Sequence, residues 1–243
     1  MKKPYVILTM LSSIDGKIEG DFIHEHNENL GNWFEYQKLE NVEAWGNGSN
    51  THEKYFSDKS IDLSRYAGTE KTDEDFVMKK EAPYIVSFDS TGKVLWNTEC
   101  LIFPDDVRNH VLVVTTKRVE PEYTAYLREQ KIPYIFAGND AISLPTALDK
   151  LYTLFGIKRF AIVGGSTINA AFIKENLVDE IRLLIAPFID GSREKTITET
   201  PDNIRLTKQF SLDSVNRLED DGVLIIYKKN ICKGVIVWTD AIF

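Results

Sequence analysis

A chain of 243 residues with 43% hydrophobic and 27% charged side chains has the composition of an ordinary globular protein that buries a sizeable core. Its formal net charge of −8 comes from acidic residues spread along the chain, and no basic stripe interleaves with aromatics, so nucleic acid is not predicted as a partner. No apolar stretch approaches the about 18 residues of a membrane span. The two cysteines lack metal-type spacing and no signal-peptide pattern opens the chain, so we expect a soluble, cytoplasmic protein with reduced thiols.

Six short apolar segments, each bounded by residues that break secondary structure, predict the strands of a central sheet. The first, residues 5–11, is nearly continuous in apolar and β-branched residues, which is typical of a strand buried on both faces of a parallel sheet. The others follow at 84–88, 111–115, 134–137, 160–163 and 181–185.

The segments between these strands have helical patterns. The clearest helix is predicted over 144–155, where six apolar residues share one face, with Ser143 as the cap and Pro145 in the first turn. Further helices are predicted over 123–128 and 167–176. Strands that alternate with helices predict an α/β domain with right-handed crossovers and a parallel centre.

The remaining parts of the chain differ from this pattern. Strands predicted over 204–212 and 222–227 are close in sequence, which indicates an antiparallel edge of the sheet. The charged stretch at about 52–82 is poor in aliphatic residues and predicts a surface insertion, so that 1–243 form one domain. In the extra tail, about 229–243, the apolar run 235–238 fits either an added strand or a contact with a second subunit.

The most informative segment for function is the passage from a predicted strand into a predicted helix at Gly164 and Gly165. Glycines let a ligand approach the backbone closely, and the free amides of a helix N-terminus present partial positive charge to a phosphate. A pyrophosphate fits such a site. The alternative is a tight strand-to-helix turn that uses two glycines for its own geometry.

A resemblance to a known family rests on four motifs. The run Val-Gly-Gly-Ser-Thr-Ile-Asn at 163–169, with Leu-Val-Asp-Glu-Ile-Arg-Leu at 177–183 and Ile-Ala-Pro at 185–187, resembles the closing half of the reductase domain of the bacterial bifunctional riboflavin-biosynthesis deaminase-reductase. Ser-Ile-Asp-Gly-Lys at 13–17 resembles that family's opening motif, and the similarity extends from about residue 4 to 228. It implies a dihydrofolate-reductase-like three-layer α/β/α fold with a mostly parallel sheet and an antiparallel C-terminal edge, NADPH as cofactor, and a homodimer.

The resemblance also assigns cofactor residues. In that family the Gly-Gly-x-Thr loop holds the cofactor pyrophosphate, a role that here falls to Gly164, Gly165, Ser166, Thr167 and Ile168. The family's second element, Gly-Arg-x-Thr, matches residues 48–51, with Ser49 in place of the arginine and Thr51 keeping the hydroxyl that donates to phosphate.

Preference for NADPH over NADH is indicated by the end of the strand predicted over 111–115. Thr115, Thr116, Lys117 and Arg118 supply two hydroxyls and two cations where the family binds the adenosine end of the cofactor. An NAD site usually ends such a strand with a carboxylate, which would repel a 2′-phosphate, and no carboxylate precedes Glu120. The alternative is that Lys117 and Arg118 form a solvated loop.

On the substrate side, Asp15 and Trp33 are the candidate residues. Asp15 either hydrogen-bonds a substrate and supplies a proton or only shapes a turn, and Trp33 either lines the cofactor pocket or belongs to the core or surface. No stronger acid-base signature is present, so solvent is the other proton source. His24 and His26 lack a third spaced ligand, so no metal site is predicted.

The chain also departs from the family pattern. The family carries Glu before the paired glycines to hold the pyrimidine, and here that residue is Val163. Its ribosyl-phosphate arginines have no counterpart beyond Lys54 and Arg65. The leading prediction is an NADPH-dependent reductase of a small heterocyclic or sugar-phosphate substrate, with 5-amino-6-(5-phosphoribosylamino)uracil as the family default. The alternatives are a pterin or dihydrofolate-like reductase and a catalytically silent nucleotide-binding protein.

Overall fold

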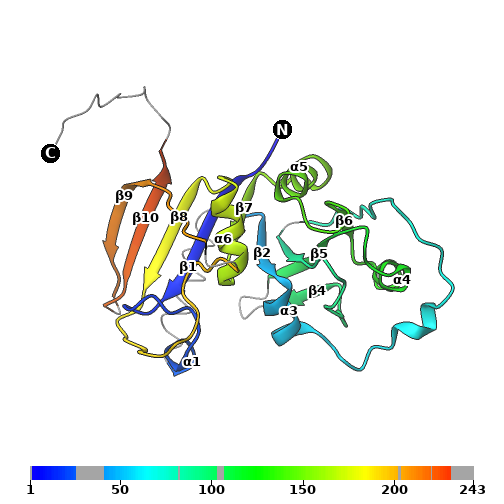
Figure 1. The fold of residues 1–243 in the computed structure, drawn as a ribbon, viewed down its shortest axis with the longest axis horizontal. Coiled ribbons are helices and arrows are strands. Elements are labelled where there is room, and N and C mark those ends of the chain that lie inside the picture. The colour runs from blue at the N-terminus through cyan, green and yellow to red at the C-terminus, as the bar shows by residue number, and fades with distance from the viewer. Residues whose placement is uncertain are drawn as a thin grey trace.

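The computed structural model describes residues 2–25, 41–81, 83–102, 107–201, 204–219 and 221–230 of the chain. Within these ranges, ten strands form one mixed sheet in the order β4-β5-β3-β2-β7-β1-β8-β10-β9, with β6 also paired to β5 (Figure 1). In chain order the elements are β1 (Tyr5–Ser12), α1 (Asp21–Glu25), β2 (Ala44–Gly48), α3 (Ser49–Phe56), the 3₁₀ helix η1 (Leu63–Tyr66), β3 (Tyr84–Phe88), β4 (Cys100–Ile102), β5 (Arg108–Thr115), α4 (Pro121–Glu129), β6 (Tyr134–Phe136), α5 (Leu144–Phe155), β7 (Arg159–Ile162), α6 (Ser166–Lys174), β8 (Glu180–Ile185), β9 (Phe210–Arg217) and β10 (Val223–Lys229).

The centre of the sheet is parallel, as the apolar strands predict. β1 lies between β7 and β8 and is parallel to both, so that Leu8 has Ile162 on one side and Ile181 on the other. All six predicted strands are present, with bounds within three residues of the prediction. The apolar pattern does not reveal β2, because its five residues include two glycines and an asparagine. Gly46 is required there, since a Cβ atom would lie 2.3 Å from the ring of Phe160.

Helices cover both faces of the sheet, which confirms the predicted three-layer arrangement. α5 and α6 pack on one face, over a cluster that includes Leu8, Val86 and Leu112. α4 packs on the other face, over Val111 and Val113. α1 covers the same second face farther along, because Phe22 packs against Leu11, Leu184 and Leu224.

α5 has the bounds that the sequence predicts, and the local signals explain why. The Ser143 hydroxyl accepts a hydrogen bond from the amide of Thr146, and Pro145 lies in the first turn. Gly156 ends the helix with a φ of 76°, a left-handed conformation that favours glycine. The other two predicted helices correspond to α4 and α6.

Two predictions for the rest of the chain need correction. The strand predicted over 204–212 is wrong, because pairing with β10 begins only at Phe210 and continues to Arg217, so β9 and not β10 is the edge of the sheet. The charged stretch 52–82 does not lie wholly on the surface. His52 is buried on α3, and Leu63 and Phe76 pack against the cluster beneath α4.

Several sequence predictions fall on residues outside the described ranges, namely Trp33, His26 and the run 235–238. Across the part of the chain that the structure describes, no helix is long and apolar enough to cross a bilayer. The same ranges hold no cluster of three histidine, cysteine or acidic residues able to bind a metal ion.

Candidate functional site

The candidate site lies where the parallel strands end. The predicted residues Asp15, Thr51 and Gly164 follow the carboxyl ends of β1, β2 and β7, respectively. β7 lies directly between β1 and β2, so these three strand ends are neighbours at one edge of the sheet (Figure 1). The carboxyl edge of an open α/β sheet is where such folds bind their ligands.

Two helix N-termini meet at this edge, and neither has a side-chain cap. α3 begins after Gly48 and α6 begins after Gly165, and in both helices the N-cap side chain that would accept an amide hydrogen is missing. The backbones touch, because the Gly48 amide donates to the Gly164 carbonyl at 3.3 Å. We call the space between these two N-termini, bounded by Gly48, Thr51 and Gly165, the amide cradle. Its partial positive charge suits an anion.

The two glycines of the loop act in different ways. Gly164 has a φ of 101°, which L side chains rarely adopt, and a Cβ there would lie 3.2 Å from the Met10 side chain. Gly165 has an ordinary φ of −71°. A Cβ at Gly165 would have one neighbour, the Thr51 hydroxyl at 4.0 Å. Gly165 therefore serves to keep the cradle open, since a side chain there would project into space that holds almost no other atom.

Asn47 holds the loop in place, and the sequence reasoning missed it. Its side-chain amide donates to the carbonyls of Val163 and Gly164, both at 3.2 Å. These bonds tie the end of β2 to the turn after β7 across 116 and 117 residues of sequence. The signal that could have identified Asn47 is its position between two glycines, which is unusual in a strand; the structure shows it half-buried there.

The first turn of α6 offers one of its two hydroxyls to a ligand. Ser166 is buried, and its hydroxyl lies 3.5 Å from the Glu199 carboxylate, so what Ser166 can offer to the cradle is its backbone amide. Thr167 is exposed. Ile168 lies 3.8 Å from the position that a Cβ of Gly48 would occupy and so lines the wall of the cradle.

The strand end predicted to bind the 2′-phosphate is arranged differently. The hydroxyls of Thr115 and Thr116 donate to the carbonyls of Asp89 and Ser90, both at 2.7 Å, and both residues are fully buried. They join the ends of β3 and β5 and do not fit the predicted role as donors to a ligand. The side chain of Lys117 is 41% exposed, and its ammonium lies 3.3 Å from the Asp73 carboxylate.

Asp15 links two loops at the same edge. Its carboxylate accepts hydrogen bonds from the Ser13 hydroxyl at 2.6 Å and from the amides of Asp190 and Gly191 at 3.0 and 2.9 Å. These hydrogen bonds, that of Ser13 foremost, hold the pKa of Asp15 well below its ordinary value of 3.8. A carboxyl group that remains ionised does not supply a proton, so the geometry supports the turn-forming alternative.

Lys54 and Arg65, the possible counterparts of the family's ribosyl-phosphate arginines, do not lie together at the cradle. Arg65 forms an ion pair with Glu129 at the C-terminal end of α4. α4 runs against the direction of the parallel strands, so this end lies away from their carboxyl edge. Lys54 lies over the ring of Tyr55, 4.9 Å from its centroid.

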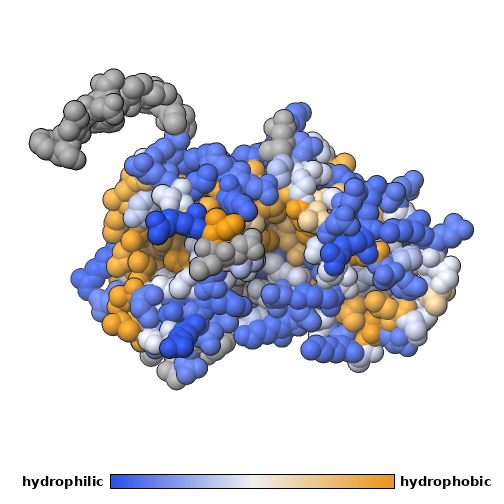
Figure 2. All heavy atoms as spheres, in the orientation of Figure 1, coloured by the Kyte–Doolittle hydropathy of each residue, from blue (hydrophilic) through white to orange (hydrophobic). Residues whose placement is uncertain are grey.

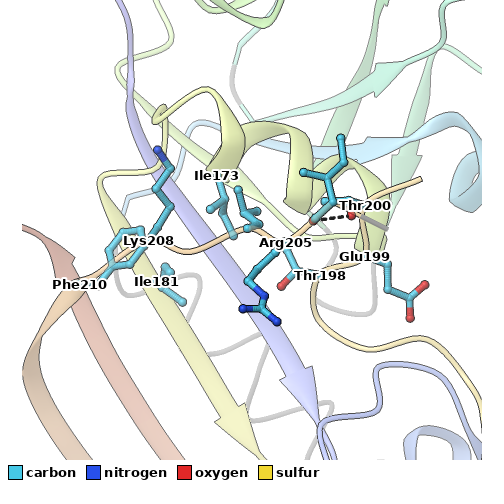
Figure 3. A pocket seen from close by; sticks show the side chains of 10 residues that line it. Ile173, Ile181, Thr198, Glu199, Thr200, Arg205, Lys208 and Phe210 are labelled. Carbon is cyan, nitrogen blue, oxygen red and sulfur yellow. Dashed lines mark hydrogen bonds between the residues drawn. The ribbon is translucent and has the colours of Figure 1, made fainter. Parts of the chain in front are cut away.

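A separate groove of about 850 Å³ lies beside α6 and the start of β8 (Figure 3). Ile173, Ile181 and Phe210 form its apolar floor, and Arg205 and Lys208 lie on the segment that flanks it. None of the residues that define the amide cradle lines it, so it is a distinct feature of the surface.

Comparison with known proteins identifies the family. Residues 4–224 match the family described as the RibD C-terminal domain. The chain belongs to this family. The resemblance to riboflavin-biosynthesis reductases, inferred above from the glycine loop and its sequel, is thereby confirmed.

Curated relatives of this RibD C-terminal domain protein have one name in common. The 2,5-diamino-6-ribosylamino-4(3H)-pyrimidinone 5′-phosphate reductase of Methanothermobacter thermautotrophicus is 34% identical over 102 residues, which are 39% of this chain and 46% of the relative. The enzyme of the same name from Archaeoglobus fulgidus is 28% identical over 116 residues, 48% of this chain and 50% of the relative. The matched part thus spans half or less of each of these relatives.

Solved structures show the shared fold. The pyrimidine reductase-like protein of Corynebacterium diphtheriae has a TM-score of 0.60 at 17% identity, covering 93% of this chain and 91% of that one. RibD of Acinetobacter baumannii has a TM-score of 0.60 at 19% identity, covering 94% and 58%. The riboflavin biosynthesis reductase Rib7 of Saccharomyces has a TM-score of 0.59 at 14% identity, covering 93% and 90%. The RibD C-terminal domain protein therefore has the three-layer α/β fold of these reductases.

Proposed function

We propose that this protein is an NADPH-dependent reductase of riboflavin biosynthesis, acting on a ribosylaminopyrimidine 5′-phosphate. The observation that carries this proposal is the amide cradle, in which two uncapped helix N-termini face one open space beside Thr51. The names of the curated relatives, each a reductase of 2,5-diamino-6-ribosylamino-4(3H)-pyrimidinone 5′-phosphate, support the substrate class. A homodimer in the cytoplasm is part of the same proposal.

The residues of the cradle fit the pyrophosphate of a dinucleotide. Unpaired amides at the start of α3 and α6 have the charge and direction to bind phosphate oxygens. The exposed hydroxyl of Thr167 and the hydroxyl of Thr51 add donors from the two helices. Gly165 leaves room for the phosphate, since a side chain there would project into the same space.

The chemistry assigned to the cofactor is hydride transfer from the nicotinamide to an electrophilic carbon of the sugar or heterocycle. The chain's contribution is to hold the dinucleotide by its pyrophosphate and to keep the strand ends and loops in a fixed position around the reacting groups. The proton that balances the hydride comes from solvent in this proposal, because Asp15 is held ionised by its three hydrogen bonds.

Replacing Gly165 with alanine tests the proposal. The φ of −71° at Gly165 is open to alanine, and the melting temperature of the variant is measured beside its affinity so that a loss of binding is not mistaken for a loss of folded protein. Its methyl group occupies the cradle, and we expect NADPH affinity, measured by nicotinamide fluorescence, to fall by about tenfold or more, equivalent to about 1.4 kcal/mol.

Thr51 provides a matched pair of variants for the same titration. Thr51→Val removes the hydroxyl and should weaken NADPH binding by about fivefold to tenfold, whereas Thr51→Ser should restore most of the affinity. Absence of saturable NADPH binding by the wild type would remove the cofactor from the proposal. Tight binding without oxidation of NADPH in the presence of the ribosylaminopyrimidine phosphate would leave a nucleotide-binding protein and contradict the reductase assignment.

A further inference from the structure

The first turn of α6 is held from outside the helix by residues 196–199, a segment that we call the clasp. The side-chain amide of Asn169 donates to the Ile197 carbonyl at 2.8 Å. The Glu199 amide donates to the Ser166 carbonyl at 3.3 Å, and the Ser166 hydroxyl lies 3.5 Å from the Glu199 carboxylate. Glu199 lies beside α6 in Figure 3. These contacts fasten the start of the helix to a segment that follows it by about thirty residues.

The clasp leaves the backbone amides of the first turn free. Its contacts with α6 use the carbonyl and hydroxyl of Ser166 and the side chain of Asn169, and none of them uses a backbone amide of α6. An ordinary N-cap side chain holds such a turn by accepting hydrogens from these same amides. α6 has no side-chain cap, so the clasp can hold the turn while its amides remain available to the amide cradle.

The clasp is fixed on its other side to the loop that follows β1. Thr196 forms a bridge with Lys17, and the Ile18 amide donates to the Lys195 carbonyl at 3.0 Å. Within the clasp, the Thr196 amide donates to the Glu199 carboxylate at 2.9 Å, which closes the segment as a turn. The start of α6 is therefore tied through the clasp to the end of the central strand.

Hydrogen bonds, more than apolar burial, hold the clasp in place. Figure 2 shows hydrophobic atoms along the flank of β9 and β10, where no helix of the described ranges covers the sheet. The clasp is different, because Ile197 is its one apolar residue and packs against the cluster beneath α5 and α6. Removing a single hydrogen bond should therefore loosen the clasp without opening the core.

Asn169 is an unusual residue for its surroundings. It is fully buried, and its side-chain oxygen has no hydrogen-bond partner in the part of the chain that the structure describes. A buried acceptor without a partner lowers stability, whereas a leucine of the same branched shape would bury no polar atom there. Packing by itself does not account for an asparagine at this position. The hydrogen bond that it donates to the clasp does.

We propose that Asn169 is a positioning residue for the cofactor, which fastens the clasp to α6 and so fixes the direction of the amides that α6 presents to the amide cradle. This inference rests on the NADPH binding of the proposed function. Amides that are fixed before a ligand arrives lose less conformational freedom when they bind its phosphates. Loosening the clasp should therefore weaken NADPH binding without touching the reacting groups.

Asn169→Leu removes the donor and keeps the branched shape. We expect the dissociation constant of NADPH, measured by nicotinamide fluorescence, to rise by about fivefold to tenfold. The melting temperature should stay near that of the wild type, because the unpaired acceptor is removed together with the donor. With substrate present, the KM for NADPH should rise while kcat changes less. A merely structural role would instead lower the melting temperature and leave the affinity of the folded fraction unchanged.

Asn109→Leu is the matched control. Asn109 is also buried, and its side-chain amide also donates to a backbone carbonyl, that of Val107 at 3.0 Å. It lies at the start of β5, whereas the amide cradle lies where the parallel strands end. This variant should bind NADPH as tightly as the wild type.

Glu199 provides a second route to the same segment. Glu199→Leu removes the acceptor that the Thr196 amide and the Ser166 hydroxyl share, and should also weaken NADPH binding. Glu199→Gln retains an acceptor and should recover most of the affinity. Combining Asn169→Leu with Glu199→Leu should cost less than the sum of the two single effects, because both act through the clasp.

The outcomes separate this inference from the proposed function. A wild type that does not bind NADPH would overturn the cofactor of the proposed function and the positioning role with it. If the wild type binds NADPH and Asn169→Leu binds it equally tightly, or if Asn109→Leu loses as much affinity, the positioning role falls and the reductase proposal stands. Fully additive effects of the Asn169 and Glu199 substitutions would contradict a shared clasp.

Discussion

The side-chain amide of Asn47 helps to set the shape of the amide cradle. Its two hydrogen bonds hold the carbonyls of Val163 and Gly164 toward β2, and the amides of the next residues are then free to face the cradle. Gly165 and Thr51 contribute by what they leave open or donate, whereas Asn47 acts by positioning the backbone. None of these three contributions needs a charged side chain, because the helix termini supply the positive charge.

Replacing Asn47 with aspartate removes the donor at nearly constant size. We expect the apparent KM for NADPH to rise by about tenfold while kcat changes less, because the loop proposed to bind the cofactor loses about 1 to 2 kcal/mol of support. Asn47→Ser, which retains a shorter donor, should recover part of the loss. Steady-state kinetics with varied NADPH checks this, and an unchanged KM in the aspartate variant would contradict a positioning role.

At the scale of elements, the loops after β1 and β8 are joined through Asp15. The amides of Asp190 and Gly191 donate to its carboxylate, and the Ser13 hydroxyl completes the set. The helices also differ at their N-termini. α5 has a serine cap, whereas α3 and α6, the two helices of the site, begin at glycines without a side-chain cap. α4 also begins without a side-chain cap hydrogen bond, but at Glu120, so only α3 and α6 combine free first-turn amides with a glycine at the N-cap.

Asp15→Asn gives a pH-dependent prediction. The folded pKa of Asp15 is lowered from 3.8, so its stabilising effect is present at higher pH and is lost as the pH falls through the lower folded value. The variant should therefore melt below the wild type at pH 7 and at pH 5, and the difference should begin to shrink below about pH 4 and become small only as the pH approaches the lowered folded pKa. Thermal melts across this range measure it; a constant difference down to pH 2 would contradict the assignment.

At the scale of the whole molecule, His52 links acid stability to the core. It is fully buried on α3, with Nδ1 2.9 Å from the Ser87 hydroxyl and its ring against Trp96. Burial lowers the pKa of His52 to about 3, so the imidazole is neutral in the folded protein. The unfolded chain binds a proton at about pH 6.5, which favours unfolding as the pH falls below that value.

The whole-molecule prediction is that acidification from pH 7 to pH 5 lowers the melting temperature and that His52→Gln flattens this dependence. The glutamine amide retains a hydrogen-bond partner for Ser87. His110→Gln is the matched control, since His110 is only partly buried and its pKa is lowered to a smaller extent. An equal slope in wild type and His52→Gln would show that other groups set the acid sensitivity.

The sequence predicted the parallel strands, α5 and the glycine loop well because their signals are local. An apolar run between breakers, a capping serine with its glycine terminator, and two glycines before a helix are each readable within about a dozen residues. β2 was not predicted because its glycines and asparagine have low strand propensity. These residues are there for their contacts, Gly46 with Phe160 and Asn47 with the turn after β7. The strand at 204–212 was placed too early because apolar residues in that segment line the groove beside α6.

What the sequence determined by itself is therefore the order of elements, the family resemblance and the glycine turn that leads from β7 into α6. Only the tertiary structure decided that Thr51 meets Gly165, that Thr115 and Thr116 face inward, and that Asp15 ties two loops together. It also decided which face of β9 is left uncovered. The first three depend on strands that pair across more than a hundred residues or on which way a hydroxyl turns to find a carbonyl, and the last depends on which strands α6 covers. None of these is encoded in local spacing.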